Sequence, residues 1–125
     1  MRTLDETKGF TLIEVLIAMI ILAIGSLGVA GLTVGIIRAN VFSNKMTTAV
    51  TLAQDKMEDI KRLGYGRAET SQGTEGYRTI RNYPPYKRTT IVSSNTPTLG
   101  MTTVTVRVDW DADAHFVALN TVLAQ

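Results

Sequence analysis

The sequence predicts an α+β protein in which one long N-terminal helix packs on a small antiparallel sheet. Two patterns lead to this prediction. Apolar residues fill 10–37 almost without interruption, and a helical repeat continues from there to Leu63. Towards the other end of the chain, apolar and polar residues alternate over 102–110 and again over 115–123, which is typical of strands with one buried face.

The apolar segment at 10–37 is long enough to cross a membrane. As a helix it would be about 42 Å long, whereas the hydrocarbon core of a bilayer is about 30 Å thick. A secretory signal peptide has a shorter apolar region, of about 7–15 residues. A buried core helix would need more covering chain than the residues after Leu63 provide. Length and composition alone therefore favour a single-pass membrane anchor.

Glu14 is the only charged residue within 10–37. A carboxylate in the middle of a spanning helix costs about 2.5–3.5 kcal/mol on insertion scales, and less near an interface. A plain anchor gains nothing from this cost. The segment is therefore expected to use Glu14 for something besides crossing the membrane.

The residues around Gly9 form a specific pattern, Lys8-Gly9-Phe10-Thr11-Leu12-Ile13-Glu14. A short polar leader ends in a basic residue and glycine, an aromatic residue follows, and glutamate stands at the fifth position after the glycine. This pattern resembles the class III signal of type IV prepilins. The resemblance implies that residues 1–9 are a leader and that 10–37 is a transmembrane and filament-core helix.

The resemblance also implies two modifications of the chain. A prepilin peptidase of the inner membrane would cut the bond between Gly9 and Phe10 on the cytoplasmic side, and would then methylate the new amine of Phe10. The junction suits this reaction, because Gly9 has no Cβ and an extended backbone there can enter a narrow protease cleft.

Glu14 lies one helical turn after the amine that cleavage would create at Phe10. It can pair with that amine in its own chain or with the amine of an adjacent subunit. The resemblance implies the second pairing, which would set the axial register as a subunit leaves the bilayer. A buried carboxylate becomes less costly when it meets a cation. The alternative is that Glu14 reaches the membrane interface and has no further role.

Gly31 and Gly35 have the small-xxx-small spacing that lets helices approach closely in lipid. This spacing indicates that the helix packs tightly against similar helices. The alternative is that glycine is simply frequent in membrane helices.

The helix is expected to continue through 38–63 as an amphipathic segment. Apolar residues recur there at spacings of three or four, at Met46, Ala49, Val50, Ala53, Met57, Ile60 and Leu63. Lys61 and Arg62 suit a helix C-terminus, and Gly64 is expected to end the helix. The apolar stripe needs a partner surface, which residues 64–125 must supply.

Residues 64–97 are rich in Gly, Ser, Thr, Asn and Pro, which predicts a long loop that holds short strands at 77–81 and 88–93. Within it, Tyr83-Pro84-Pro85-Tyr86 predicts a rigid turn or extended segment. The apolar face of the next strand, at 102–110, consists of Val104, Val106, Val108 and Trp110. A turn at 111–114 would join it to the last strand, giving an antiparallel sheet of three or four strands across the helix.

Two further stretches resemble minor subunits of the same superfamily. Leu52-Ala53-Gln54-Asp55-Lys56-Met57-Glu58 is similar to the corresponding region of minor pilins and pseudopilins. The strand that ends in Trp110, the acidic turn and the last strand resemble the end of PilV-like minor pilins and GspI-like minor pseudopilins. With the leader, this resemblance implies the type IV pilin fold for the whole chain.

Asp109, Asp111 and Asp113 alternate like the first ligands of an EF-hand calcium loop. Such a loop also needs glycine at its sixth position and glutamate at its twelfth, where this chain has Ala114 and Asn120. Related pseudopilins do bind calcium, in a loop that does not map onto this one. A solvated hairpin without metal is favoured, and no cofactor is predicted.

The composition argues against several other functions. The chain has no cysteine, which excludes disulfides and thiolate metal sites. The net charge is +2 and no run of like charges indicates nucleic-acid binding. His115 is the only histidine, and no phosphate-binding loop or hydrolase motif occurs. We therefore expect the substrate of a processing enzyme, not an enzyme.

The expected function is that of a structural subunit, a minor pilin, of a type IV pilus. Its partners would be the prepilin peptidase, the inner-membrane assembly platform, membrane lipid and other pilin subunits. It would lie in the inner membrane before assembly and in a periplasm-spanning or extracellular filament afterwards. The alternatives are a minor pseudopilin of a type II secretion system, a major pilin subunit and a single-pass membrane-anchored binding domain.

Overall fold

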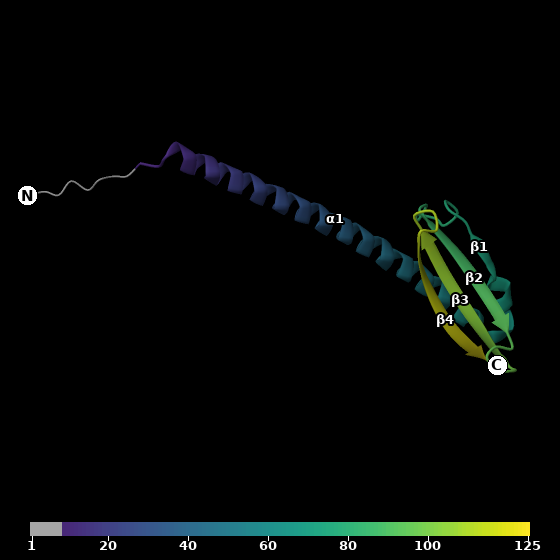
Figure 1. Cartoon of the computed structure of the whole chain (residues 1–125). Helices are drawn as coiled ribbons and strands as arrows, with labels where there is room; N and C mark the ends of the chain where they lie inside the picture. The colour runs from purple at the N-terminus through teal and green to yellow at the C-terminus, as the bar shows by residue number, and fades with distance from the viewer. Residues whose placement is uncertain (1–8) are drawn as a thin grey trace, which may run out of the picture. The chain divides into compact units, whose positions relative to one another are not determined.

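The computed structural model describes residues 9–125. Over these residues the chain forms, in order, α1 (Leu12–Leu63), the 3-10 helix η1 (Tyr65–Ser71), β1 (Gly73–Glu75), β2 (Tyr86–Ser94), β3 (Met101–Trp110) and β4 (His115–Ala124). Figure 1 shows the long helix and the four strands. The predicted α+β fold is confirmed, because a long N-terminal helix packs on a four-stranded antiparallel sheet.

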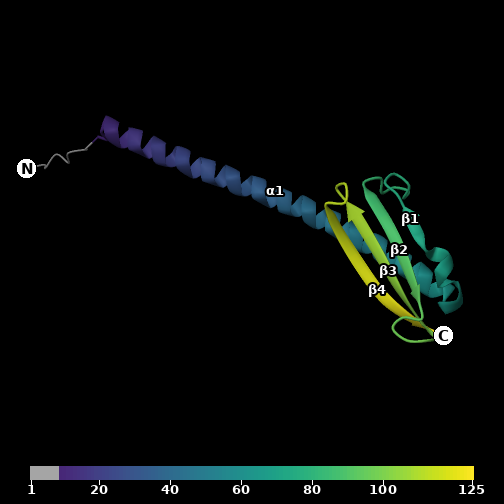
Figure 2. The same ribbon diagram turned by 45° about the vertical axis from the view of Figure 1, so that its right-hand side comes forward.

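The chain divides into two compact units. The first ends at Asn40 and the second covers Val41–Gln125, and α1 continues through the boundary. In the second unit, the C-terminal part of α1 lies across one face of the sheet, as Figures 1 and 2 show from two directions. The second unit therefore has the helix-on-sheet arrangement that the amphipathic pattern requires.

The helix α1 begins at Leu12, slightly later than the expected start at Phe10, and ends at Leu63 as predicted. Gly64 stops it by adopting a φ of 75°, a left-handed conformation that glycine reaches without the steric cost that a Cβ would bring. The N–H group of Gly64 donates to the carbonyl oxygen of Ile60 at 3.2 Å. The last turn of α1 is thereby closed before the chain leaves the helical path.

The four strands form a single meander with the order β1-β2-β3-β4, and every neighbouring pair is antiparallel. The strands predicted at 102–110 and 115–123 are confirmed as β3 and β4, and the hairpin turn at 111–114 joins them. The strand predicted at 88–93 is confirmed and is longer, because β2 covers Tyr86–Ser94. Three of the four strands could thus be located from the sequence, two of them from side-chain alternation.

The strand predicted at 77–81 is wrong. This segment forms turns, and the first strand is the shorter β1 upstream of it. Within this segment, Arg78 has a φ of 67°, in the left-handed region, which is incompatible with a regular strand. The N–H group of Arg78 donates to the carbonyl oxygen of Pro84 at 3.0 Å, which folds the segment back on itself. Ile80 is buried in the core as part of this turn.

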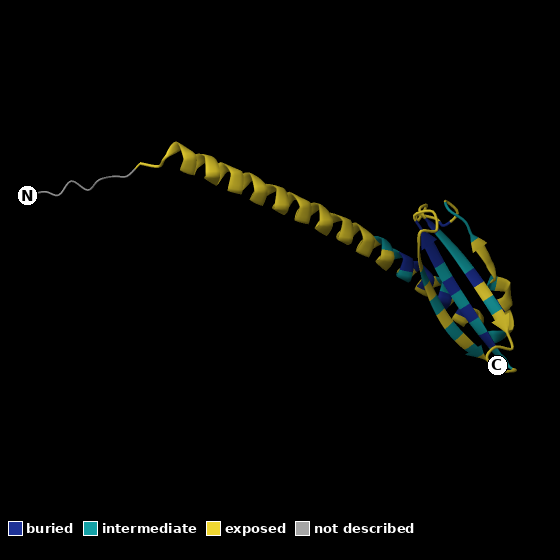
Figure 3. Cartoon of the chain, in the orientation of Figure 1, coloured by how far each residue is buried: buried dark blue, intermediate teal, exposed yellow. Residues whose placement is uncertain are grey.

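The hydrophobic core lies between α1 and the inner face of the sheet. Figure 3 shows the buried positions concentrated on β3 and on the part of α1 beneath the sheet. The helix contributes Ala49, Leu52, Ala53, Met57 and Ile60. The remaining core residues are Ala68, Ile80, Tyr86, Val104, Val106, Val108 and Trp110. Because Ala49 and Ala53 have small side chains, the helix backbone can lie close to the valine face of β3.

The predicted apolar stripe of α1 is mostly confirmed, with corrections at its ends. Met46 and Leu63 are exposed, at 45% and 43%. Leu52, which was not placed on the stripe, is buried at 4%.

Two hydrogen bonds also tie the sheet to backbone carbonyls of the helix. Arg88 donates to the oxygen of Leu52 at 3.1 Å, and the Tyr86 hydroxyl donates to the oxygen of Lys45 at 3.2 Å.

Candidate functional site

The N-terminal part of α1 presents its apolar side chains outward. The most apolar stretch of the helix has a mean hydropathy of 2.6, and none of it is buried. Leu12 is 87% exposed, and Leu27 is 74% exposed. By length and composition this helix is able to cross a membrane. Nothing within residues 9–40 covers these side chains, so a lipid bilayer or other helices would have to do so.

The predicted cleavage bond joins two exposed residues that precede the helix. Gly9 and Phe10 belong to no helix or strand, and the Phe10 side chain is 85% exposed. Among residues 9–125, and apart from the neighbouring residue in the chain, no heavy atom lies within 4 Å of the position that a Cβ on Gly9 would occupy. An exposed peptide bond outside regular structure is accessible to a protease. The predicted leader residues before Gly9 lie outside the described residues.

Thr11 caps the N-terminus of α1 and brings Glu14 into the first helical turn. The N–H group of Glu14 donates to the Thr11 hydroxyl oxygen at 3.3 Å and to the Thr11 carbonyl oxygen at 3.1 Å. Thr11 and Glu14 have the spacing of a capping box, in which threonine at the cap is followed three residues later by glutamate. This cap was not among the predicted features of the N-terminus. It gives Glu14 a local role at the start of the helix.

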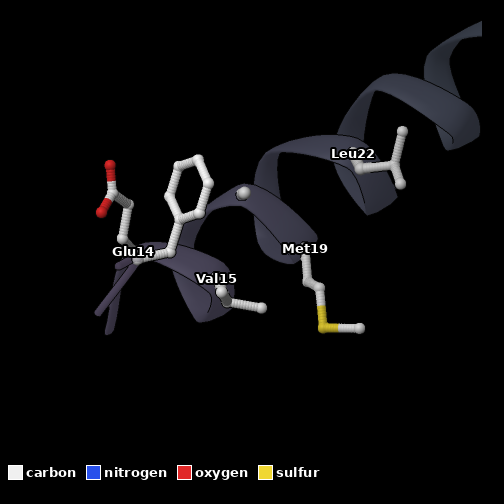
Figure 4. A pocket seen from close by; sticks show the side chains of 6 residues that line it. Glu14, Val15, Met19 and Leu22 are labelled. Atoms are coloured by element: carbon white, nitrogen blue, oxygen red, sulfur yellow. The ribbon is translucent and has the colours of Figure 1, made fainter. Parts of the chain in front are cut away.

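The Glu14 carboxylate is open to partners from outside the chain. In Figure 4 it extends away from the Met19 and Leu22 side chains, at the edge of a shallow apolar groove. Within residues 9–125, no lysine or arginine forms an ion pair with this carboxylate. A negative group in the first turn is favourable because of the helix dipole. A cation near the groove would add a second favourable interaction.

The other polar side chains in the apolar segment satisfy themselves within the helix. The Ser26 hydroxyl donates to the carbonyl oxygen of Leu22 at 2.8 Å, and the Thr33 hydroxyl donates to that of Val29 at 2.9 Å. Such bonds to the carbonyl four residues earlier let hydroxyl groups enter an apolar environment without losing a partner. Glu14 is therefore set apart from these residues by its charge.

Gly31 and Gly35 lie on α1 one turn apart. Beyond the adjacent residues and the nearby helix backbone, no described atom lies within 4 Å of the position where a Cβ would stand on either residue, so neither glycine is required by a close tertiary contact. The pair forms a flat strip on the helix surface that a second helix could approach.

The three aspartates at the β3–β4 turn each have a basic partner. Asp111 accepts from Lys45 at 2.6 Å, and Asp113 pairs with Lys87 at 2.5 Å. Asp109 is 2% exposed and is paired with Arg107 at 2.6 Å. Within residues 9–125, no group of three or more His, Cys, Asp or Glu side chains is placed to hold a metal ion. The three aspartates therefore do not converge on one point.

The electrostatics of this turn support its role in fixing the hairpin. A hydrogen bond from Lys87, together with one from the Tyr77 hydroxyl at 2.8 Å, holds the pKa of Asp113 below its usual value. Hydrogen bonding to Asp113 in turn raises the pKa of Lys87. Both side chains are therefore charged at neutral pH.

His115, the single histidine, packs by its ring against Phe42 and Trp110, at centroid distances of 5.2 and 5.6 Å.

Residues 6–30 match the family model described as the prokaryotic N-terminal methylation motif. The match includes Gly9, Phe10 and Glu14 and covers the apolar segment as far as residue 30. Neither the comparison with curated proteins nor the comparison with solved structures gave a match. The motif supports a type IV pilin-like or pseudopilin precursor, which is a structural protein, and implies processing by a prepilin peptidase and assembly with other pilin subunits.

Proposed function

We propose, from the premise that this chain is a type IV pilin-like precursor, that it is a minor subunit of a type IV pilus. In this proposal the peptidase cuts the Gly9–Phe10 bond and methylates the amine of Phe10. The processed chain waits in the inner membrane as a single-pass protein. An assembly platform in that membrane then transfers it into a filament that spans the periplasm or extends outside the cell.

The observation that carries the proposal is the combination of a matched methylation motif with an uncovered apolar helix. The motif ends inside a helix segment whose most apolar stretch has no buried residue. A soluble protein would hide such a surface, because exposed contiguous apolar surface is unfavourable in water. A bilayer before assembly, and neighbouring helices after it, would each provide the cover that the chain itself lacks.

In this mechanism Glu14 acts as an electrostatic guide. Its carboxylate lacks an ion-pair partner within residues 9–125. Cleavage creates a cationic amine at Phe10, and the corresponding amine of a neighbouring subunit would meet Glu14 in the filament. An unpaired carboxylate in an apolar bundle is strongly unfavourable, so the pair selects one axial position over all others. We further propose that Gly31 and Gly35 let the neighbouring helices approach closely.

The processing step is tested by the mass of the mature protein. The wild-type chain, purified from its native membrane, is expected to begin at a methylated Phe10. The variant Gly9→Leu should retain its leader, because the leucine side chain obstructs entry of the backbone into the protease. Gly66→Leu is a suitable control for the same change far from the junction, because Gly66 has no left-handed backbone and open space around the position of a Cβ. Full-length wild-type protein would contradict the proposal and would favour a simple membrane-anchored domain.

The assembly step is tested with Glu14→Ala, in comparison with Glu58→Ala on the exposed face of the same helix. Glu14→Ala should be processed but should appear in sheared filaments at a level at least about tenfold lower, the effect of a loss of about 1.4 kcal/mol. Glu58→Ala should assemble like the wild type. Normal incorporation of Glu14→Ala would overturn the guiding role. A minor pseudopilin would show the same processing, and its filament would instead depend on secretion genes.

A further inference from the structure

The two edges of the sheet are very different. At one edge, β1 has only three residues, and its Glu75 carboxylate is held by Arg88 at 2.6 Å and by Lys56 at 3.7 Å. At the other edge, β4 has ten residues and lies beyond β3 as the last strand of the described sheet. A long edge strand offers many more sites for pairing with another chain than a short one.

The backbone direction along β4 can be read from its last hydrogen bond. The N–H group of Gln125 donates to the carbonyl oxygen of Gly100 at 3.1 Å, on the β3 side. Backbone groups in a strand alternate in direction with a period of two. The odd-numbered residues of β4 therefore pair with β3. The even-numbered residues present free N–H and C=O groups at the open edge, and they are Phe116, Ala118, Asn120, Val122 and Ala124.

The side chains of β4 do not protect this edge. After His115 the strand contains no lysine, arginine, aspartate, glutamate or proline. Its pairing with β3 runs without a bulge from the Trp110–His115 pair to the Met101–Ala124 pair. Phe116 and Val122 are 55% and 48% exposed. Natural sheets usually block exposed edges with charges, proline or bulges, and none of these occurs along β4.

The polarity of the sheet identifies the neighbour that fits. Because the sheet has four antiparallel strands, β1 and β4 run in opposite directions. A second subunit of the same topology and the same orientation would therefore place its first strand antiparallel to β4. By contrast, two copies whose β4 strands paired antiparallel to each other would have their helices in opposite directions. That arrangement is unsuitable for helices that enter one membrane from the same side.

We infer that β4 is a strand-addition edge, which receives the first-strand edge of a neighbouring filament subunit with the same strand order and helix direction. The inference rests on the proposed function, since a filament supplies neighbours in one orientation. Backbone hydrogen bonds would provide the affinity, and the absence of charge on β4 means that the neighbour needs no complementary charge. Pairing through the sheets would add to the contacts made by the apolar helices.

Two lysine variants in the full chain separate the edge from the rest of the outer face. Asn120→Lys places a charge on the open edge, whereas Thr105→Lys places the same charge on the adjacent position of β3. We expect Asn120→Lys to lower the filament-associated fraction about tenfold, and Thr105→Lys to leave it within about twofold of the wild type. Equal effects of both variants, or no effect of either, would overturn the inference.

A proline variant provides an independent check. Ala118→Pro removes a free N–H group at the open edge, and the hydrogen bonds between β3 and β4 stay intact because that group does not take part in them. The fluorescence of Trp110, the single tryptophan, verifies that the core is folded. Loss of incorporation in a folded protein supports strand addition. Normal incorporation of Ala118→Pro contradicts it.

A photo-crosslinking amino acid identifies the neighbour directly. Benzophenone-alanine at position 120 in assembled filaments is expected to crosslink to the first strand of another pilin-like subunit, as determined by mass spectrometry of the linked peptides. The same probe at position 93, on the outer face of β2, is the control. Crosslinks between two copies of β4, or to lipid alone, would overturn the inference. If the leader is removed normally in every variant, a negative result counts against strand addition at β4 and not against the proposed function.

Discussion

The two units of this chain are stabilised in opposite ways. In the second unit, α1 and the sheet bury Ile60, Val104, Val106 and Trp110 almost completely. In the first unit, the helix carries a longer run of apolar residues and buries none of its most apolar stretch. The same apolar residue types therefore serve two purposes. Where a sheet covers them they hold the fold together, and where nothing covers them they select an environment.

This comparison shows why the helix changes its pattern along its length. Up to Ile37 every face of the helix is apolar, which suits a surrounding that is apolar on all sides. After Asn40 one face is apolar and the rest is polar, which suits a helix with a sheet on one side and water on the other. The hydrophobic pattern of each half therefore indicates the environment that the half is suited to, although both halves belong to one continuous helix.

The largest expected effect comes from removing a core side chain. Trp110→Ala should destabilise the second unit by about 3–5 kcal/mol, because a large buried ring is lost and a cavity remains. The matched variant Leu27→Ala removes an exposed side chain of the first unit. It should leave hydrogen exchange of the sheet amides unchanged in detergent micelles. Faster sheet exchange in Leu27→Ala would mean that the two units are energetically coupled, and the comparison would fail.

A smaller effect is expected from the ion pair that holds β1 against β2. A hydrogen bond from Arg88 lowers the pKa of Glu75 below its ordinary value of 4.5, despite partial burial that raises it. The carboxylate therefore stabilises the fold above about pH 4.5, and this contribution is lost as the pH falls below that value. Glu75→Gln should cost about 1 kcal/mol at pH 7.

The measurement is the thermal unfolding of the full chain in micelles, followed by Trp110 fluorescence between pH 7 and pH 3. The drop in midpoint below pH 4.5 should be smaller in Glu75→Gln than in the wild type. Glu58→Gln, an exposed glutamate on α1, controls for the general loss of a carboxylate. An identical acid profile for Glu75→Gln and the wild type would show that the Arg88 contact does not matter for stability.

The smallest effect is expected at the β3–β4 turn. Lys45 and Asp111 are 2.6 Å apart, but their side chains remain 39% and 41% exposed. Asp111→Asn should therefore change stability by less than about 1 kcal/mol, and the difference should shrink further in high salt. The same Trp110 unfolding signal measures it. A loss as large as that of Trp110→Ala would place this turn among the main supports of the fold.

The sequence was sufficient to predict an element wherever its periodic pattern was long or a residue that ends the element followed it. The end of α1 could be predicted because Gly64 is the residue that reaches a φ of 75° at low cost. The strands β3 and β4 could be predicted because their alternation continues for about ten residues in each. The cleavage junction and Glu14 could be identified as candidates from a motif that the comparison with family models also recognises.

Other features depended on contacts that a linear pattern does not contain. The strand β1 has three residues, too few to show alternation. The segment at 77–81 contains residues that favour strands, but the left-handed backbone at Arg78 and the contact with Pro84 turn it. Tertiary packing overrides local preference in such short segments.

Asp109 shows the same limit for a side chain. Its place on the outer face of β3 predicted a solvated carboxylate. The register places Lys87 and Phe116 on either side of it, and Arg107 covers it with its guanidinium group 4.0 Å from the Phe116 ring. By contrast, the role of Thr11 could have been predicted, since threonine three residues before glutamate at the start of an apolar run is a known cap pattern.

The hydroxyl groups of Ser26 and Thr33 affect the transfer of the helix from one apolar environment to another. Each hydroxyl donates to a backbone carbonyl oxygen one turn earlier in the same helix, so donor and acceptor move together. Removing an unsatisfied hydroxyl from water costs roughly 2–7 kcal/mol, and that cost would arise in any dry surrounding. Because these hydroxyl groups need no hydrogen-bond partner outside the helix, the segment can move from lipid into a helix bundle without breaking or forming a hydroxyl contact. Among the polar groups of the apolar segment, only Glu14 would then favour one of these two environments over the other.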